Sequence, residues 1–75
     1  MPKLPVISAR DAIKVFEQLG YKIVRQRGSH IRMHHILDNT RRPLTIPNHK
    51  ILGKGLLRKL LRDSDLSVED FIKLV

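Results

Sequence analysis

The stretch that decides the fold is YKIVRQRGSHIRMHHI, which occupies residues 21–36. Residues 21–26 are rich in β-branched and aromatic side chains, and residues 30–36 resume the same character. Between them, residues 27–29 contain Gly28, and glycine adopts a positive φ at little cost. The stretch therefore predicts two antiparallel strands joined as a hairpin.

The sequence on either side of this hairpin predicts a further strand and two helices. Residues 37–41 have the Asp-Asn composition of a second turn, and residues 43–47 form a short run between two prolines that suits a strand. Two tight turns joining three strands predict an antiparallel meander. Apolar residues at helical spacing predict a helix over residues 9–19 and an amphipathic, basic one over residues 56–62.

A third, short helix is expected at the C-terminal end. Ser67 precedes Asp70 by three residues, the capping pattern that Ser8 and Asp11 also form before the first helix. This helix of about eight residues must dock on the rest of the chain, because it is too short to be stable alone. Its buried residues are expected to be Val68, Phe71, Ile72 and Val75. The predicted fold class is α+β, in the order α-β-β-β-α-α, with the sheet packed on the helices.

The composition sets narrow limits on the function. The chain has 75 residues, which predicts one domain over residues 1–75 and excludes a large enzyme fold with a deep pocket. It contains no cysteine, so disulfides, thiolate nucleophiles and cysteine-based zinc sites are excluded. No apolar run reaches the roughly 18 residues that a membrane span requires, and the N-terminal residues lack the apolar stretch of a signal peptide. We therefore expect a cytoplasmic protein with no membrane partner.

Positive charge is concentrated in the middle of the chain. The formal net charge is +8, but residues 22–62 hold eleven basic residues and a single acid, Asp38. A surface selected for solubility alone would mix the two signs. This segregation predicts a polyanionic partner, with nucleic acid favoured over an acidic protein and over an anionic membrane. The three aromatic residues occupy expected core positions, which disfavours base-stacking modules and favours recognition of an RNA backbone.

Four histidines raise the question of a metal site. His30 and His34 would lie on one side of the predicted second strand, about 13 Å apart and too far to share an ion. His35 would point to the other side. We therefore expect no metal and no other cofactor.

Alternation along the second strand places chemically useful side chains on its open face. Ile31 and Met33 must meet the helices because they are apolar. The opposite side then holds His30, Arg32 and His34. An imidazole titrates near pH 6.5 and a guanidinium stabilises negative charge, a combination suited to a phosphodiester. The alternative interpretation is an exposed polar face without a function.

Two further segments are candidates for phosphate contacts. Gly28 would let a substrate phosphate approach the backbone beside His30, although an ordinary hairpin turn is the simpler explanation of this glycine. Farther along the chain, a helix N-terminus with Lys54, Arg58 and Lys59 would attract phosphate. A solvated basic helix face is the alternative there.

Four segments resemble the HicA toxin family: VRQRGSH at residues 24–30, LTIPNH at 44–49, GLLRKLL at 55–61 and LSVEDF at 66–71. The resemblance covers nearly the whole chain and implies a small fold similar to the double-stranded-RNA-binding domain. It also implies an mRNA interferase, a ribosome-independent endoribonuclease that is the toxin of a type II toxin–antitoxin module. A HicB-type antitoxin would hold it inactive.

The resemblance also implies which residues act. The catalytic histidine of the family follows Gly-Ser and corresponds to His30, with Gly28 and Ser29 supporting the catalytic turn. A metal-independent mechanism follows as a hypothesis, in which His30 is the general acid or base while the RNA 2′-hydroxyl attacks the adjacent phosphorus. His34 is a candidate for the second proton carrier. The residues expected to bind RNA phosphates are Lys22, Arg32, Lys54, Arg58 and Lys59.

Two other functions are compatible with the same charges. A non-catalytic RNA-binding module of this fold would bind structured RNA through the basic helix and cleave nothing. A pure interaction protein would use its basic face only to receive an acidic antitoxin. Loss of cleavage without loss of binding, on substitution of His30, separates an enzyme from both.

Overall fold

The computed structural model describes residues 3–75. The helices are α1 (Ala9–Gln18), α2 (Lys54–Asp63) and α3 (Val68–Leu74), and the strands are β1 (Tyr21–Arg27), β2 (His30–His35) and β3 (Leu44–Pro47). The predicted α-β-β-β-α-α order and α+β class are confirmed, and the arrangement is similar to that of the double-stranded-RNA-binding domain. Within these residues, no helix has the length and apolar character needed to cross a membrane.

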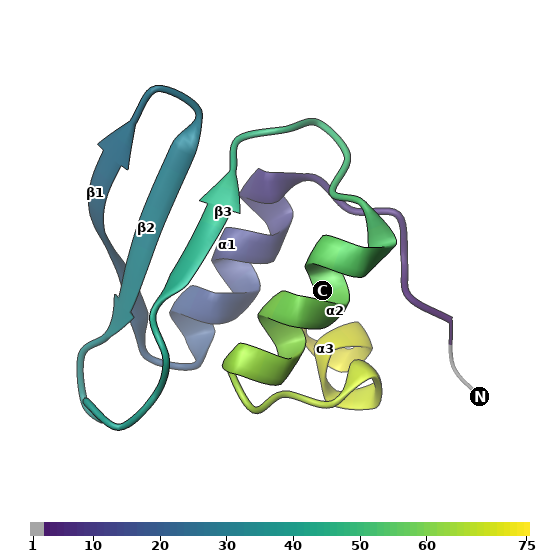
Figure 1. Ribbon diagram of the computed structural model, residues 1–75. Coiled ribbons are helices and arrows are strands. Elements are labelled where there is room, and N and C mark those ends of the chain that lie inside the picture. The colour runs from purple at the N-terminus through teal and green to yellow at the C-terminus, as the bar shows by residue number, and fades with distance from the viewer. Residues whose placement is uncertain (1–2) are drawn as a thin grey trace.

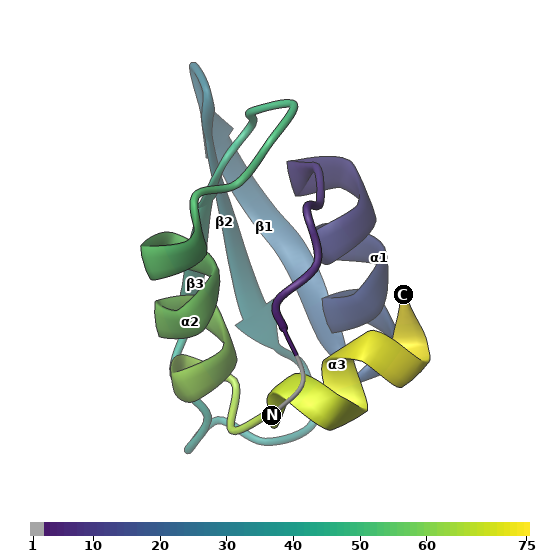
Figure 2. The same cartoon turned by 90° about the vertical axis from the view of Figure 1, so that its right-hand side faces the viewer.

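The elements form two layers (Figures 1 and 2). The sheet order is β1-β2-β3 with both pairs antiparallel, so β1 lies at an edge, while β3 is followed on its outer side by α2. In Figure 2 the sheet and α2 lie to one side, and α1 and α3 lie to the other. One face of the sheet therefore packs on α1, and the opposite face is open to solvent.

The core lies between these two layers and is centred on aromatic rings. Phe16 of α1 is completely buried, and its ring centroid lies 6.1 Å from that of Tyr21 and 6.2 Å from that of Phe71. These three rings come from α1, β1 and α3. The cluster therefore holds the first helix against both the sheet and the last helix.

The side-chain caps predicted for α1 and α3 are present. The backbone N–H of Asp11 donates to Ser8 Oγ over 3.1 Å, and that of Asp70 donates to Ser67 Oγ over 3.0 Å. Each hydroxyl satisfies one of the backbone donors that a helix N-terminus leaves without an intrahelical partner. α2 has no such cap and begins at Lys54, slightly earlier than the periodicity predicted.

The predicted burial of α3 is wrong for two residues. Phe71 is fully buried and Val68 half-buried, as expected, but Ile72 is 40% exposed and Val75 is 61% exposed. Phe71 points into the core and so sets the inner side of this seven-residue helix. Leu74 lies three residues farther on, on that same side, and packs against the core instead.

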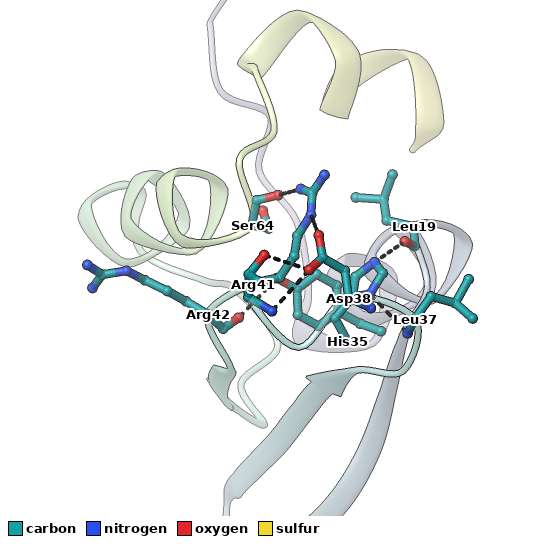
Figure 3. A network of polar contacts seen from close by, with 9 residues as sticks. Leu19, His35, Leu37, Asp38, Arg41, Arg42 and Ser64 are labelled. Carbon is teal, nitrogen blue, oxygen red and sulfur yellow. Dashed lines mark hydrogen bonds and ion pairs between the residues drawn. The ribbon is translucent and has the colours of Figure 1, made fainter.

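His35 joins α1, β1 and the loop after β2 (Figure 3). Its Nε2 lies 2.7 Å from the carbonyl oxygen of Leu19, and the backbone N–H of Asp38 donates to its Nδ1 over 3.0 Å. Because Nδ1 accepts, the ring proton is on Nε2 and is donated to Leu19. The ring also packs edge-on against Tyr21, with centroids 5.0 Å apart, and lies over Gly20.

The loop between β2 and β3 is tied to α2 (Figure 3). The hydroxyl and backbone N–H of Thr40 donate to Asp38 Oδ1, and Arg41 pairs with the same carboxylate at 3.6 Å. The Thr40 hydrogen bonds, with a smaller effect of Arg41, lower the pKa of the Asp38 carboxyl group. Arg41 also donates to the carbonyl oxygen of Ser64 over 2.7 Å. These contacts connect the loop to the C-terminal end of α2.

We expect Gly20→Ala to destabilise the protein and Gly55→Ala to stabilise it. Gly20 has a φ of 104°, and a left-handed conformation costs a residue with a side chain about 1–2 kcal/mol. The added Cβ would also lie 2.8 Å from His35 Nε2. At Gly55, the second residue of α2, an added Cβ meets nothing within 4 Å, and the gain should be no more than the roughly 0.5–1 kcal/mol by which alanine is favoured over glycine in the middle of a helix.

Urea unfolding of the two variants measures both free energies. A Gly20→Ala variant as stable as the wild type would show that the His35–Gly20 contact does not constrain the fold.

Candidate active site and nucleic-acid interface

The two faces of β2 differ as the sequence predicted. Ile31 and Met33 are buried toward α1. His30 and His34 are exposed on the opposite face, and Arg32 is half-buried there. Because successive side chains of a strand point to opposite sides, these three residues share the open face of the sheet.

The neighbouring strands add to this face through their register. Residues opposite each other in an antiparallel pair project to the same side. The pairs between β1 and β2 on this face are Lys22–His34, Arg25–Arg32 and Arg27–His30. β3 contributes Thr45 opposite Arg32 and Pro47 opposite His30.

A β-bulge in β1 determines which of its residues lie on the open face. Val24 is an extra residue between two paired ones, so the register shifts there. Strict alternation from the buried Tyr21 would have turned Arg25 and Arg27 toward α1. The bulge moves the alternation by one residue, and both arginines lie on the same face as His30.

Five side chains surround a shallow hollow of about 310 Å³ on the open face: Arg25, Arg27, His30, Arg32 and Thr45. Arg32 Nη1 donates to Thr45 Oγ1 over 2.8 Å, which fixes one guanidinium group at its edge. Within residues 3–75, none of the three arginines forms an ion pair with an acid. Arg25 and Arg32 even face each other across the strands, an arrangement of like charges that destabilises a sheet. The hollow is therefore suited to an anion.

The turn before His30 is fixed through its backbone. Gly28 has a φ of 56° at the first position of a two-residue loop, where a type II′ turn places glycine. A Cβ at this position would meet nothing within 4 Å, so the backbone conformation, and no contact within the protein, requires the glycine. The Ser29 carbonyl accepts from the backbone N–H of Asn48 over 2.6 Å, which ties the turn to the segment after β3.

The basic residues of α2 lie away from the hollow. Lys54 and Arg58 line a separate hollow between α2, α3 and the N-terminal segment. Lys59 is paired with Asp63 over 3.2 Å. The structure thus separates these three cations from the histidine face, whereas it brings Lys22 and Arg32 onto that face.

The other histidines have different surroundings. His34 lies four residues along β2 from His30, about 13 Å away, and lines a different hollow. This distance is too long for His34 to be the second proton carrier of a reaction at His30. His35 is half-buried between the end of α1 and the loop after β2, and His49 is exposed. Among residues 3–75, no three His, Asp or Glu side chains are grouped in a way that would hold a metal ion.

Residues 9–66 match the family described as the HicA toxin of bacterial toxin–antitoxin. The match extends from α1 through the whole sheet to α2. The chain belongs to the HicA toxin family. No curated protein sequence matches it significantly.

Membership of the HicA toxin family identifies the kind of system in which the protein acts. The protein is the toxin of a toxin–antitoxin module, so it pairs with an antitoxin. The matched range includes the hairpin, its glycine turn and all residues of the hollow.

Three residues of the hollow are not predicted by the sequence patterns: Arg25, Arg27 and Thr45. The position of Thr45 beside Arg32 depends on the register between β2 and β3, which no local sequence pattern reveals. The sequence does contain a signal for the position of the two arginines. Regular alternation along the strand would direct both guanidinium groups at the core, where no acid among residues 3–75 is available to pair with them. Arginine is almost never buried without a partner, so a break in the alternation was the better interpretation.

We expect Arg25→Gln to raise the free energy of unfolding by less than about 1 kcal/mol, because it removes one of two like charges that face each other across β1 and β2. Added salt should shrink this gain, since it already screens the repulsion. Urea unfolding at low and high salt measures both effects.

The matched control is Lys14→Gln on the exposed side of α1, where Asp11 and Glu17 lie three residues away in either direction. This variant should lose a little stability rather than gain it. Equal gains in both variants would mean that overall net charge, and not the Arg25–Arg32 pair, is responsible.

Proposed function

We propose that this toxin is a metal-independent endoribonuclease that cleaves mRNA and uses His30 to transfer a proton. The observation that supports the proposal most directly is the hollow, in which one imidazole lies among three guanidinium groups. Imidazole exchanges protons near neutral pH, and guanidinium groups bind phosphate oxygens with two parallel hydrogen bonds. Proton transfer and charge stabilisation are then both supplied by side chains.

The scissile phosphate would bind in the hollow beside His30. Arg27 lies directly across the hairpin from His30, and Arg32 is the next residue along the same face of β2. Both guanidinium groups can stabilise the negative charge that grows on the phosphate oxygens during the reaction. The open space beside Gly28 allows the RNA backbone to approach this end of the hairpin.

The bond-breaking step follows from these positions. His30 removes the proton of the ribose 2′-hydroxyl, and the 2′-oxygen attacks the adjacent phosphorus. The bond between phosphorus and the 5′-oxygen breaks, which gives a 2′,3′-cyclic phosphate and a 5′-hydroxyl. Among residues 3–75, His30 is the one histidine or acid that lines the hollow, so water on the open face would protonate the leaving oxygen.

The remaining candidate residues act at a distance from this step. Lys22 lies on the open face beyond the hollow, and Lys54, Arg58 and Lys59 lie on α2. Their charges would raise the affinity for longer RNA without taking part in bond breaking. Gly28 and Ser29 would support the catalytic turn through its backbone.

An antitoxin of the HicB type would inhibit the enzyme by covering the open face. An acidic surface would neutralise the three unpaired arginines and exclude RNA from His30. Because mRNA is the proposed substrate, we expect the toxin to act in the cytoplasm.

His30→Ala should reduce cleavage of a long single-stranded RNA by about 10²–10⁴-fold, the usual contribution of a general acid or base. The reaction is measured with EDTA present, and RNA affinity is measured in parallel. His49→Ala, which changes an exposed imidazole outside the hollow, is the matched control and should cleave normally.

Three results would contradict the proposal. Equal cleavage by both variants would remove His30 from the reaction, and cleavage of all-deoxy strands would remove the 2′-hydroxyl. Binding of RNA without any cleavage by the wild type would favour a non-catalytic binding module.

A further inference from the structure

Three cross-strand pairs on the open face form successive steps along β2. They are Arg27–His30 beside the turn, Arg25–Arg32 in the middle and Lys22–His34 at the far end. Side chains on one face of a strand repeat every second residue, so neighbouring steps are about 6.6 Å apart. Every step contains at least one Lys or Arg.

The cations form one row of steps along the pairing of β1 with β2. On the same face, β3 contributes only Thr45 and Pro47, so no second row of charges runs parallel to the first on the sheet. A duplex presents two phosphate backbones, whereas one line of cations matches one backbone. An extended single strand repeats its phosphates over a distance similar to the spacing of the steps.

The chemistry also favours a single strand. Attack by a 2′-oxygen requires that oxygen to lie in line with the bond that breaks, and a regular A-form duplex holds it out of line. A strand laid along the open face remains free to adopt the reactive geometry.

The steps are placed asymmetrically about His30. The hairpin turns at Gly28 and Ser29, so beyond the Arg27–His30 step the sheet ends. In the opposite direction it continues through two more basic steps. A strand with its scissile phosphate at His30 would therefore meet the cations of the sheet on one side only.

Resting on the proposed ribonuclease activity, we propose that the toxin binds one extended RNA strand along β2, with one phosphate on each step. The scissile phosphate occupies the Arg27–His30 step, its neighbour the Arg25–Arg32 step, and the next phosphate lies beside Lys22. Arg25 is therefore a binding residue for the phosphate adjacent to the cleaved bond. The charge on that adjacent phosphate is part of what the toxin recognises.

The test uses a short single-stranded RNA with one mapped cleavage site, in which single phosphates are replaced by uncharged methylphosphonates. On one side of the cleaved bond, neutralising the first phosphate should raise KM by about tenfold, since charge-assisted hydrogen bonds are lost. Neutralising the second should raise KM by a smaller factor, and on the other side the effect should stay below about twofold. kcat should change little in every case.

The assignment of Arg25 is tested by combining the two changes. Arg25→Gln should raise KM about tenfold on the unmodified strand but add almost nothing on the strand whose first phosphate is neutral. Lys14→Gln on α1 is the matched control and should keep the full sensitivity to that neutral phosphate.

Equal effects on both sides of the bond, or an Arg25→Gln loss that is the same on both strands, would overturn the inference even if the enzyme is active. If the wild type cleaves nothing, the ribonuclease proposal fails separately. The Kd values of short 2′-O-methyl strands with three phosphates, intact or neutral at the middle one, then decide the inference. The inference is supported if Arg25→Gln raises Kd on the intact strand but not on the strand with the neutral phosphate. It is rejected if Arg25→Gln raises Kd by the same factor on both strands.

Discussion

The contact between His35 and Gly20 is the constraint on which the rest of the structure depends. The imidazole ring fills the space that a side chain at residue 20 would occupy, and its two nitrogens bond the end of α1 and the loop after β2. The last residue of β2 is thereby fixed toward α1. Because side chains alternate along a strand, this fixes the direction of the whole strand. An inward-facing imidazole at one end thus determines that His30, at the other end, faces solvent.

Local rules explain why much of this arrangement could be predicted. The alternation of β2, the glycine turn and the two serine caps each depend on a few neighbouring residues. Periodicity alone does not predict the bulge at Val24, and its one signal in the sequence is that a regular ladder would direct two guanidinium groups at the core. The inner side of α3 depends on where Phe71 meets α1, which involves residues far apart in the chain.

The concentration of basic residues in the sequence predicted a polyanionic partner, but it did not distinguish two separate surfaces. The cations of the open face and those of α2 look alike in the sequence, but only the former lie around His30. The unpaired arginines reduce the stability of the sheet when nothing is bound to it. In the proposed function, RNA and an acidic antitoxin would each relieve this repulsion, so they would compete for the same surface.

The position of β1 at the edge of the sheet has a consequence for solubility. An exposed edge strand offers unpaired backbone groups to any other strand, and such edges promote aggregation unless charges or a bulge disrupt them. β1 has both, in Lys22, Arg25, Arg27 and the irregularity at Val24. The residues that we propose bind RNA therefore also keep copies of the toxin from joining edge to edge. Loss of these charges in evolution would therefore expose the edge of β1 to misassembly.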